Sequence, residues 1–248
     1  MEMRPLRGRA PAGAALAGAV LAGTVLAGVA GGGPAAAAGA LRASWSFDTP
    51  VGGGYRDSSG GGHGLRAVAR YGGRVAAVSR PPGRAVAFPA RCPGACARAI
   101  LQTPHAASLN PGTARIRWGG LVRLARGQAG GGQNLVQKGY ADRGGQYKLQ
   151  VDGAAGRPSC AVVGTGAGRT HLALAAVSVA DGAWHGVQCG RSGTALVIWV
   201  DGVPRGRARV PAGLAIRPTA PVRLGGKGVS LGNDQFHGAL DHVWIRIG

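Results

Sequence analysis

The stretch D-G-A-W-H-G-V-Q-C-G-R-S-G-T-A-L-V-I-W-V-D-G-V, residues 181–203, decides how the fold is interpreted. Residues 184–189 are predicted to form one strand, followed by a turn at 191–194. Residues 196–200 are rich in β-branched side chains, which favour a returning strand. Asp201-Gly202 is the strongest short signal for a hairpin turn, so a third strand is expected over 203–210. The stretch therefore predicts a β-meander.

Short apolar runs continue along the rest of the chain, separated by Gly, Pro, Asn and Asp. The 48 Gly and 15 Pro disfavour long helices. Many short strands with turn signals between them are typical of an all-β sandwich or barrel. No change in composition divides residues 41–248, so we expect one domain there. The predicted strands outside the meander cover residues 44–47, 85–88, 114–124, 134–137, 146–151, 160–163, 222–224 and 239–247.

Residues 1–40 are predicted to be a secretory signal peptide. The first nine residues contain arginines, and no charge follows until Arg42. The run P-A-A-A-A-G-A then has the small residues of a cleavage site, which places cleavage near Ala38 or Ala40. The uncharged gap is also long enough for a membrane anchor, but its many Ala and Gly residues make it only weakly apolar. No later segment could span a membrane stably, so we expect a secreted product.

Export would place the four cysteines in an oxidising compartment, where disulfides form. Cys92 and Cys96 flank the sequence C-P-G-A-C, in which Pro-Gly favours a tight turn and a local bridge. That pairing leaves Cys160 to bridge Cys189 and tie the meander to the strand near residue 160. A four-cysteine zinc site is the alternative, but the spacing lacks paired C-x-x-C motifs.

The formal net charge of +20 would attract anionic polymers such as cell-wall polymers, acidic polysaccharides or nucleic acids. The arginines are scattered along the sequence, however, and this pattern also fits a solvated surface without a partner. No aromatic-plus-basic RNA-binding motif is present, so no specific nucleic-acid partner is expected.

Several motifs resemble, in the correct order, the laminin-G-like jelly roll of the concanavalin A-like lectin/glucanase superfamily. The resemblance implies a two-sheet antiparallel jelly-roll sandwich with a groove on the concave face of a curved sheet. It also implies glycan or protein ligands and, in many members, a calcium ion. The matching segments are S-W-S-F-D (44–48), D-S-S-G-G-G-H-G (57–64), A-R-I-R-W (114–118), N-L-V-Q-K-G-Y (134–140), D-G-A-W-H-G-V (181–187) and F-H-G-A-L-D-H-V-W-I (236–245).

The positions that match the family's calcium ligands are Asp57 and, with weaker agreement, Asp48 and Asp241. Gly61 stands where the family usually has Asn, and acidic residues are scarce. A structural calcium ion is therefore an expectation taken from the resemblance.

The scarcity of acid also argues against catalysis. Glu2 is the single Glu, and it lies in the predicted signal peptide. Glycosidases of this fold use paired Glu residues as nucleophile and acid, and that motif is missing. Most Asp residues, including Asp152, Asp181 and Asp201, sit in sequences that form turns. The serine-hydrolase elbow, the H-E-x-x-H zinc motif and the phosphate-binding loop are missing as well.

The candidate ligand-binding residues are aromatic. Trp118 and Trp199 are the tryptophans expected to be exposed for sugar stacking. Tyr140 and Tyr147 are expected to line a polar site formed by a loop. The other tryptophans, Trp45, Trp184 and Trp244, are expected in the core, because large aromatic side chains bury much apolar surface.

The sequence therefore predicts a secreted, non-catalytic binding module for extracellular carbohydrate or an anionic cell-wall polymer. Two alternatives remain open: a polysaccharide lyase of the same fold, which could use His, Tyr and Arg, and a protein-protein adhesion module.

Overall fold

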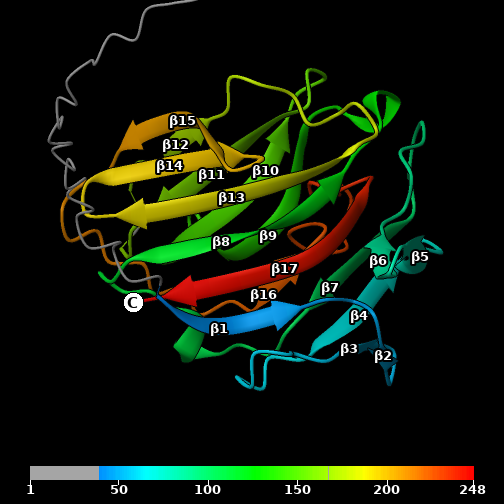
Figure 1. Ribbon diagram of the computed structural model, residues 1–248, viewed down its shortest axis with the longest axis horizontal. Helices are drawn as coiled ribbons and strands as arrows, with labels where there is room; N and C mark the ends of the chain where they lie inside the picture. The colour runs from blue at the N-terminus through cyan, green and yellow to red at the C-terminus, as the bar shows by residue number, and fades with distance from the viewer. Residues whose placement is uncertain (1–38, 167) are drawn as a thin grey trace, which may run out of the picture. The chain divides into compact units, whose positions relative to one another are not determined.

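The computed structural model describes residues 39–166 and 168–248, which form two antiparallel sheets packed face to face (Figure 1). This arrangement confirms the predicted two-sheet sandwich. The eight-stranded sheet contains β1 (Ala40–Trp45), β5 (Ala76–Arg80), β6 (Gly83–Ala87), β8 (Ile116–Arg123), β13 (Trp184–Ser192), β14 (Ala195–Val200), β15 (Val203–Arg209) and β17 (Ala239–Ile247). The nine-stranded sheet contains β2 (Pro50–Val51), β3 (Gly54–Tyr55), β4 (Leu65–Arg70), β7 (Arg98–Gln102), β9 (Gly132–Tyr140), β10 (Gly145–Asp152), β11 (Arg157–Val163), β12 (His171–Leu174) and β16 (Val222–Leu224).

The strand order places segments that are far apart in sequence side by side. It is β15-β14-β13-β8-β17-β6-β5 in the eight-stranded sheet, with β1 also paired to β17. In the nine-stranded sheet it is β12-β11-β10-β9-β16-β7-β4-β3-β2. Helical structure in the described residues is limited to η1 (Ala107–Leu109) and η2 (Arg126–Gln128), so no helix there could cross a bilayer.

The ends of the fold meet in one sheet. Ala40 begins β1 and pairs with Ile247 at the end of β17. The predicted signal peptide, residues 1–40, lies outside the described residues except for Gly39 and Ala40. The described residues belong to one compact unit.

The core between the sheets is centred on two large aromatic side chains. Trp118 of β8 and Tyr147 of β10 are fully buried, and their ring centroids lie 5.4 Å apart. The Tyr147 hydroxyl donates a hydrogen bond to the carbonyl oxygen of Leu109 at 3.1 Å, which satisfies a polar group that burial would otherwise leave without water.

Both predicted disulfides are present. Cys160 of β11 is bonded to Cys189 of β13, so this bridge joins the two sheets. Both of its cysteines are fully buried, and Cys189 is the cross-strand partner of Trp118. The bridge therefore fastens the two layers at the centre of the core.

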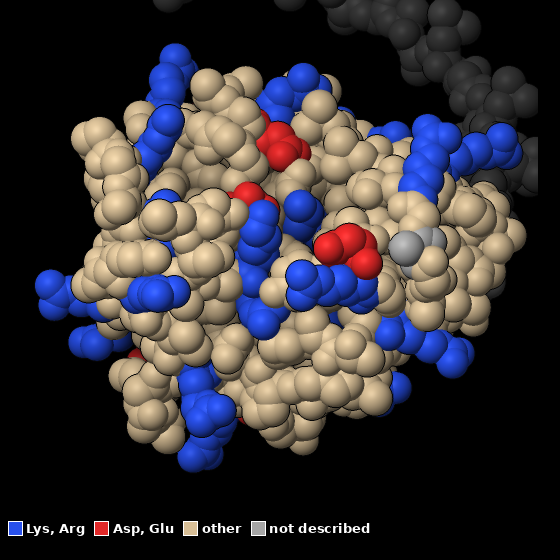
Figure 2. Space-filling view, turned by 180° about the vertical axis from the view of Figure 1, so that it is seen from behind, with Lys and Arg blue, Asp and Glu red and all other residues tan. Residues whose placement is uncertain are grey.

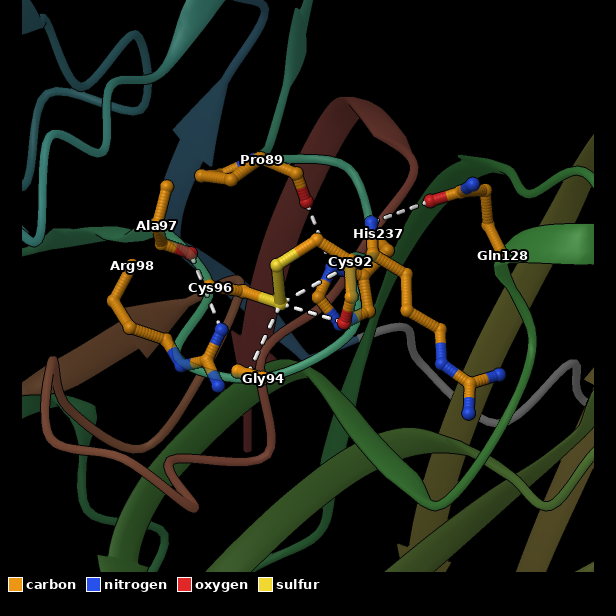
Figure 3. Close-up of a disulfide and its surroundings, with 9 residues drawn as sticks. Pro89, Cys92, Gly94, Cys96, Ala97, Arg98, Gln128 and His237 are labelled. Atoms are coloured by element: carbon orange, nitrogen blue, oxygen red, sulfur yellow. Dashed lines mark hydrogen bonds between the residues drawn. A yellow bond between two sulfur atoms is a disulfide. The ribbon is translucent and has the colours of Figure 1, made fainter.

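The second disulfide, Cys92–Cys96, closes a short loop between β6 and β7 (Figure 3). The neighbouring Arg91 attaches this loop to the connection between β8 and β9. Its backbone N–H donates to Oε1 of Gln128 at 2.7 Å, and its guanidinium donates to the carbonyl of Ala129 at 2.9 Å. Cys92 is exposed and Cys96 is buried.

The quoted stretch forms the predicted meander, β13-β14-β15, and its polar residues hold that meander together. His185 lies between two aspartates: Nδ1 is 2.8 Å from Oδ2 of Asp201, and Nε2 is 3.1 Å from Oδ1 of Asp181. The other oxygen of Asp201 accepts the Gly186 N–H at 2.8 Å. The histidine and the two Asp-Gly pairs therefore serve the scaffold.

We predict that the two disulfides differ in their effect on stability. A chain-entropy estimate gives about 3–4 kcal/mol for the long Cys160–Cys189 loop and about 2 kcal/mol for the short Cys92–Cys96 loop. Replacing Cys160 and Cys189 by Ala should therefore lower the free energy of unfolding more than the same change at Cys92 and Cys96. Denaturant unfolding of both double variants measures this, and an equal loss would contradict it.

We also predict that the His185 cluster makes stability depend on pH. Burial alone would lower the pKa of His185, but the hydrogen bonds to Asp201 and Asp181 outweigh burial and raise it. A raised folded-state pKa adds stability that is fully present below the unfolded value of about 6.5 and is lost as pH rises through the folded value. The stability advantage of the native chain over His185→Gln should therefore be largest below about pH 6.5 and shrink as pH rises above it. Urea unfolding at a series of pH values tests this, and a constant difference would refute it.

Candidate functional site

A row of polar side chains crosses the outer face of the nine-stranded sheet. Its members are successive cross-strand partners on β10, β9, β16, β7 and β4, and directly paired residues point to the same face. The neighbouring residues on these strands, such as Leu149, Val222 and Leu101, face the core. The row consists of Lys148, Gln137, Arg223, Gln102 and Arg66.

A hollow of about 400 Å³ lies beside Arg223, between the end of β9 and the loop that follows β16. Ligand pockets have volumes of about 300–1,000 Å³, so the hollow has room for a small ligand group. Figure 2 shows the molecule from behind Figure 1, with Lys and Arg gathered in the middle of this face and acidic groups beside them. The hollow is lined by Tyr140, Asp142, Arg143, Arg223, Lys227 and Ser230, among others.

Tyr140 organises the cations of this hollow. The Cζ atoms of Arg143 and Arg223 lie 5.6 Å and 5.5 Å from the centre of its ring, which is cation–π distance. Its hydroxyl accepts a hydrogen bond from Nη1 of Arg223 at 2.6 Å and donates one to the carbonyl of Lys227 at 2.9 Å. The ring and hydroxyl together hold the Arg223 guanidinium in place.

The ion pairs around the hollow leave one cation without a carboxylate. Arg143 lies 3.6 Å from Asp142, and Lys227 lies 3.1 Å from Asp234. Arg223 has no ion pair with any described residue; its Nε donates instead to Oε1 of Gln102 at 3.3 Å. An unpaired guanidinium with several donors suits an incoming carboxylate, sulfate or phosphate.

The loop after β16 supports the hollow through a buried side chain. Gln235 accepts the backbone N–H of Ala99 at 3.0 Å, and its amide donates to the carbonyls of Ala99 and Gly225. The backbone N–H of Asn134 donates to the carbonyl of Asp234 at 2.9 Å. These bonds fix the loop on the sheet, so the position of Lys227 is set by the fold.

Lys148 adds a further charge to this face. Burial lowers its pKa, and the nearby carboxylates of Asp234 and Asp152 partly offset that effect. Its partly desolvated ammonium belongs to the same polar row as Arg223.

Two of the aromatic predictions are wrong about exposure. Trp118 and Tyr147 lie fully inside the core, where neither can meet a ligand. Trp118 shares its face of β8 with Ile116 and Val122, which are also buried, because side chains of a strand alternate between faces. Burial raises the pKa of the Tyr147 hydroxyl. Of the two predicted tyrosines, only Tyr140 lines a described hollow.

Of the three tryptophans predicted to lie in the core, only one does. Trp45 is in the core as expected, but Trp184 and Trp244 are half-buried on the outer face of the eight-stranded sheet. The guanidinium carbons of Arg80 and Arg123 lie 5.3 Å and 5.2 Å from the Trp184 ring. This contact with two cations explains why an outward indole is shielded at this position.

Trp199 faces outward from β14, as predicted, but it is half-buried rather than exposed. A Cβ atom at Gly190 would lie 2.9 Å from its ring, so the glycine allows the indole to lie across β13. Arg117 also contacts the ring, with its Cζ 5.0 Å from the centroid. Trp199 lies on the opposite sheet from Tyr140, so these two predicted residues do not form one site.

The three aspartates predicted to bind calcium do not come together. The carboxylate of Asp57 accepts N–H groups of Ser44, Ser59 and His63, each at 2.9 Å. Burial alone would raise the pKa of Asp57, but these bonds outweigh it and lower the pKa. The Asp57 carboxylate therefore ties the first strand to the turn that follows it.

The other two aspartates also have partners. Asp48 accepts the Arg84 N–H at 2.9 Å, and the buried Asp241 pairs with Arg80 at 2.9 Å. In the ranges that the structure describes, no cluster of three or more His, Cys, Asp or Glu side chains could hold a metal ion. These residues therefore do not fit a shared calcium ion.

Arg223 and Lys227 were missed by the sequence reasoning. The signal available was the alternation V-R-L at residues 222–224, which places an arginine on the face opposite two buried residues.

A laminin-G family model, described as the concanavalin A-like lectin/glucanases superfamily, matches residues 122–246. This segment is just over half of the 248-residue chain. No curated protein matches the chain.

Solved structures resemble the chain at low sequence identity, and they confirm the jelly-roll fold. The binding domain of Paraclostridial Mosquitocidal Protein 1 has a TM-score of 0.60 and 12% identity, over 83% of this chain and 48% of that one. The binding domain of Botulinum Neurotoxin DC, solved with SialylT, has a TM-score of 0.61 and 9% identity, over 84% of this chain and 48% of that one. Domain 4 of AbnA, a GH43 extracellular arabinanase from Geobacillus stearothermophilus, was solved with arabinotriose. It has a TM-score of 0.56 and 16% identity, over 86% of this chain and 94% of that one. This chain spans about half the length of the two toxin domains.

We predict that calcium has no effect on thermal stability, because the three candidate carboxylates lie apart and are already bonded. A ligand that binds only the folded state raises the melting temperature. Differential scanning calorimetry in EDTA and in millimolar calcium should therefore give the same Tm. A rise of several degrees with calcium, lost in Asp57→Asn, would contradict this reasoning.

Proposed function

The chain belongs to the concanavalin A-like lectin/glucanase superfamily, and from this premise we propose that it is a secreted, non-catalytic module that binds acidic extracellular carbohydrate. The observation that carries the proposal is the Tyr140 hollow, where one aromatic ring lies against Arg143 and Arg223. Lys227 contributes a third cation to the same hollow.

The chemistry of the hollow favours an acidic sugar. The guanidinium of Arg223 can bind a carboxylate or sulfate through two parallel hydrogen bonds. The Tyr140 hydroxyl is bonded to the Arg223 guanidinium and to the backbone carbonyl of Lys227, so Tyr140 and Arg223 are preorganised for a ligand. The row from Lys148 to Arg66 extends the polar surface across the sheet, which suits an extended polymer.

The structural neighbours support binding as the general role. The neurotoxin and mosquitocidal structures are described as binding domains, and the arabinanase domain was solved with arabinotriose. At identities of 16% or less these likenesses do not transfer a ligand to this chain. The acidic ligand is inferred from the hollow itself.

The local carboxylates argue for binding over catalysis. Glycosidases need two carboxyl groups that face each other across the scissile bond. The two carboxylates beside this hollow, Asp142 and Asp234, each have a cationic partner. Secretion is supported by the two disulfides, which persist in oxidising compartments.

We predict that the chain binds polygalacturonate and that Arg223→Gln weakens this binding by about tenfold or more, since a charge-assisted hydrogen bond contributes roughly 1.5–3 kcal/mol. The fully methyl-esterified polymer, which has the same backbone without charge, should bind much more weakly. Affinity should fall as salt rises from about 50 mM to about 500 mM. Isothermal titration calorimetry measures all three effects.

The matched control is Arg205→Gln, which removes the same charge from an exposed position on β15, in the other sheet. It should leave affinity almost unchanged if the hollow, rather than the overall charge of +20, binds the polymer. Equal losses in both variants would disprove a specific site. New unsaturated ends on the polymer would instead identify a lyase.

A further inference from the structure

A second hollow lies on the opposite sheet from Tyr140. It has a volume of about 640 Å³ and is formed where the tip of the β5–β6 hairpin overhangs the outer face of β8 and β17. It shares no lining residue with the Tyr140 hollow. Its lining includes Asp48, Arg80, Pro82, Arg84, Leu121 and His242.

A β-bulge in β17 places His242 at the wall of this hollow. The pairing of β17 with β8 shifts register between Asp241 and Trp244, and His242 has a left-handed φ of 45°. Bulges of this kind redirect a side chain out of the regular alternation. His242 is 57% exposed, and its Nδ1 lies 3.0 Å from Oδ2 of Asp241. Nδ1 and Nε2 flank the same ring carbon but point in diverging directions, so Nε2 does not face Asp241.

Arg80 of the wall is fixed by Asp241, which lies buried behind it. The Asp241 side chain is 1% exposed, and its Oδ2 also lies 2.9 Å from Nη1 of Arg80. These two charges neutralise each other, and the Asp241 carboxylate also holds the Nδ1 side of the His242 imidazole.

Asp48 and Arg84 provide the polar groups of the opposite wall. Oδ1 of Asp48 accepts the backbone N–H of Arg84 at 2.9 Å, and this hydrogen bond lowers the pKa of Asp48, so the carboxylate is charged at neutral pH. Arg84 is an exposed lining residue of the hollow, and its guanidinium makes no hydrogen bond or ion pair with any described residue.

The balance of charge separates this hollow from the first one. Asp241 lies behind the lining and neutralises Arg80, while the lining itself adds one further carboxylate, Asp48, and one further guanidinium, Arg84. With Asp241 counted, these groups carry no net charge when His242 is neutral. A neutral lining gives no advantage to an acidic ligand. Asp48 accepts hydrogen bonds, Arg84 donates them, and neutral His242 can do either. Leu121 adds an apolar surface.

We propose that this hollow is a second ligand site, which binds neutral sugars through vicinal hydroxyl groups. Each sugar hydroxyl both donates and accepts a hydrogen bond, so a pair of neighbouring hydroxyls matches the Asp48 carboxylate and the Arg84 guanidinium. The C–H face of the sugar ring would contact Leu121. The molecule then holds an acidic polymer on one sheet and a neutral saccharide on the other.

The test uses an array of neutral pentose and hexose oligosaccharides, followed by calorimetric titration of the strongest one. Asp48→Asn keeps an oxygen to accept the Arg84 N–H but loses the charge, and it should weaken binding at least tenfold. His242→Gly removes the imidazole at a φ that glycine adopts readily. It should also weaken binding while the melting temperature stays equal or rises.

Arg223→Gln is the control, because it alters the other hollow, and neutral-sugar binding should be unchanged. The proposal is overturned if no neutral glycan binds, or if the bound glycan is insensitive to both Asp48→Asn and His242→Gly. Polygalacturonate binding that depends on Arg223 is measured separately, so the loss of one site is distinguishable from the loss of the other.

Discussion

The structure depends on the bond between Cys160 and Cys189, which joins the two sheets at the centre of the core. The strands of each sheet are held together by backbone hydrogen bonds, whereas the two layers meet chiefly through side chains. Beside the bridge, Trp118 of one sheet packs on Tyr147 of the other. Glycine makes up 48 of the 248 residues, so the core relies on the aliphatic and aromatic side chains that remain. The covalent bond and the aromatic pair reinforce the contact between the layers, and the outer faces carry the charge.

The acidic residues show how a strongly basic chain uses few carboxylates. Asp57 receives three backbone N–H groups, Asp201 and Asp181 hold His185, and Asp241 pairs with Arg80. Each of these carboxylates stabilises a turn, a bulge or a loop. The arginines outnumber them, so guanidiniums such as those of Arg223 and Arg84 remain without a carboxylate among the described residues. The two hollows differ because one gathers cations around Tyr140 and the other balances them with Asp48 and Asp241.

Much of the scaffold could be predicted from sequence because its signals are local. The Asp-Gly turns predicted the meander, and the C-P-G-A-C segment predicted one disulfide and, by exclusion, the other. The ordered motifs predicted the sandwich. The strands that were missed, such as β5 and β12, are short or poor in large apolar residues, so their alternation is weak. Trp118 was a different error, since its alternation with Arg117 already indicated the buried face.

The site was less accessible to sequence reasoning, because it depends on register between distant strands. Arg66, Gln102 and Arg223 become neighbours through the pairing of β4, β7 and β16, and no local pattern encodes that pairing. Tyr140 could be proposed from its place beside charged residues, but Lys227 needed the loop after β16 to fold over the sheet. The most direct measurement is a crystal structure with trigalacturonate. A sugar carboxylate at the Arg223 guanidinium, with the ring beside Tyr140, is the expected result. Trigalacturonate seated instead on the eight-stranded sheet, with the Tyr140 hollow empty, would contradict it.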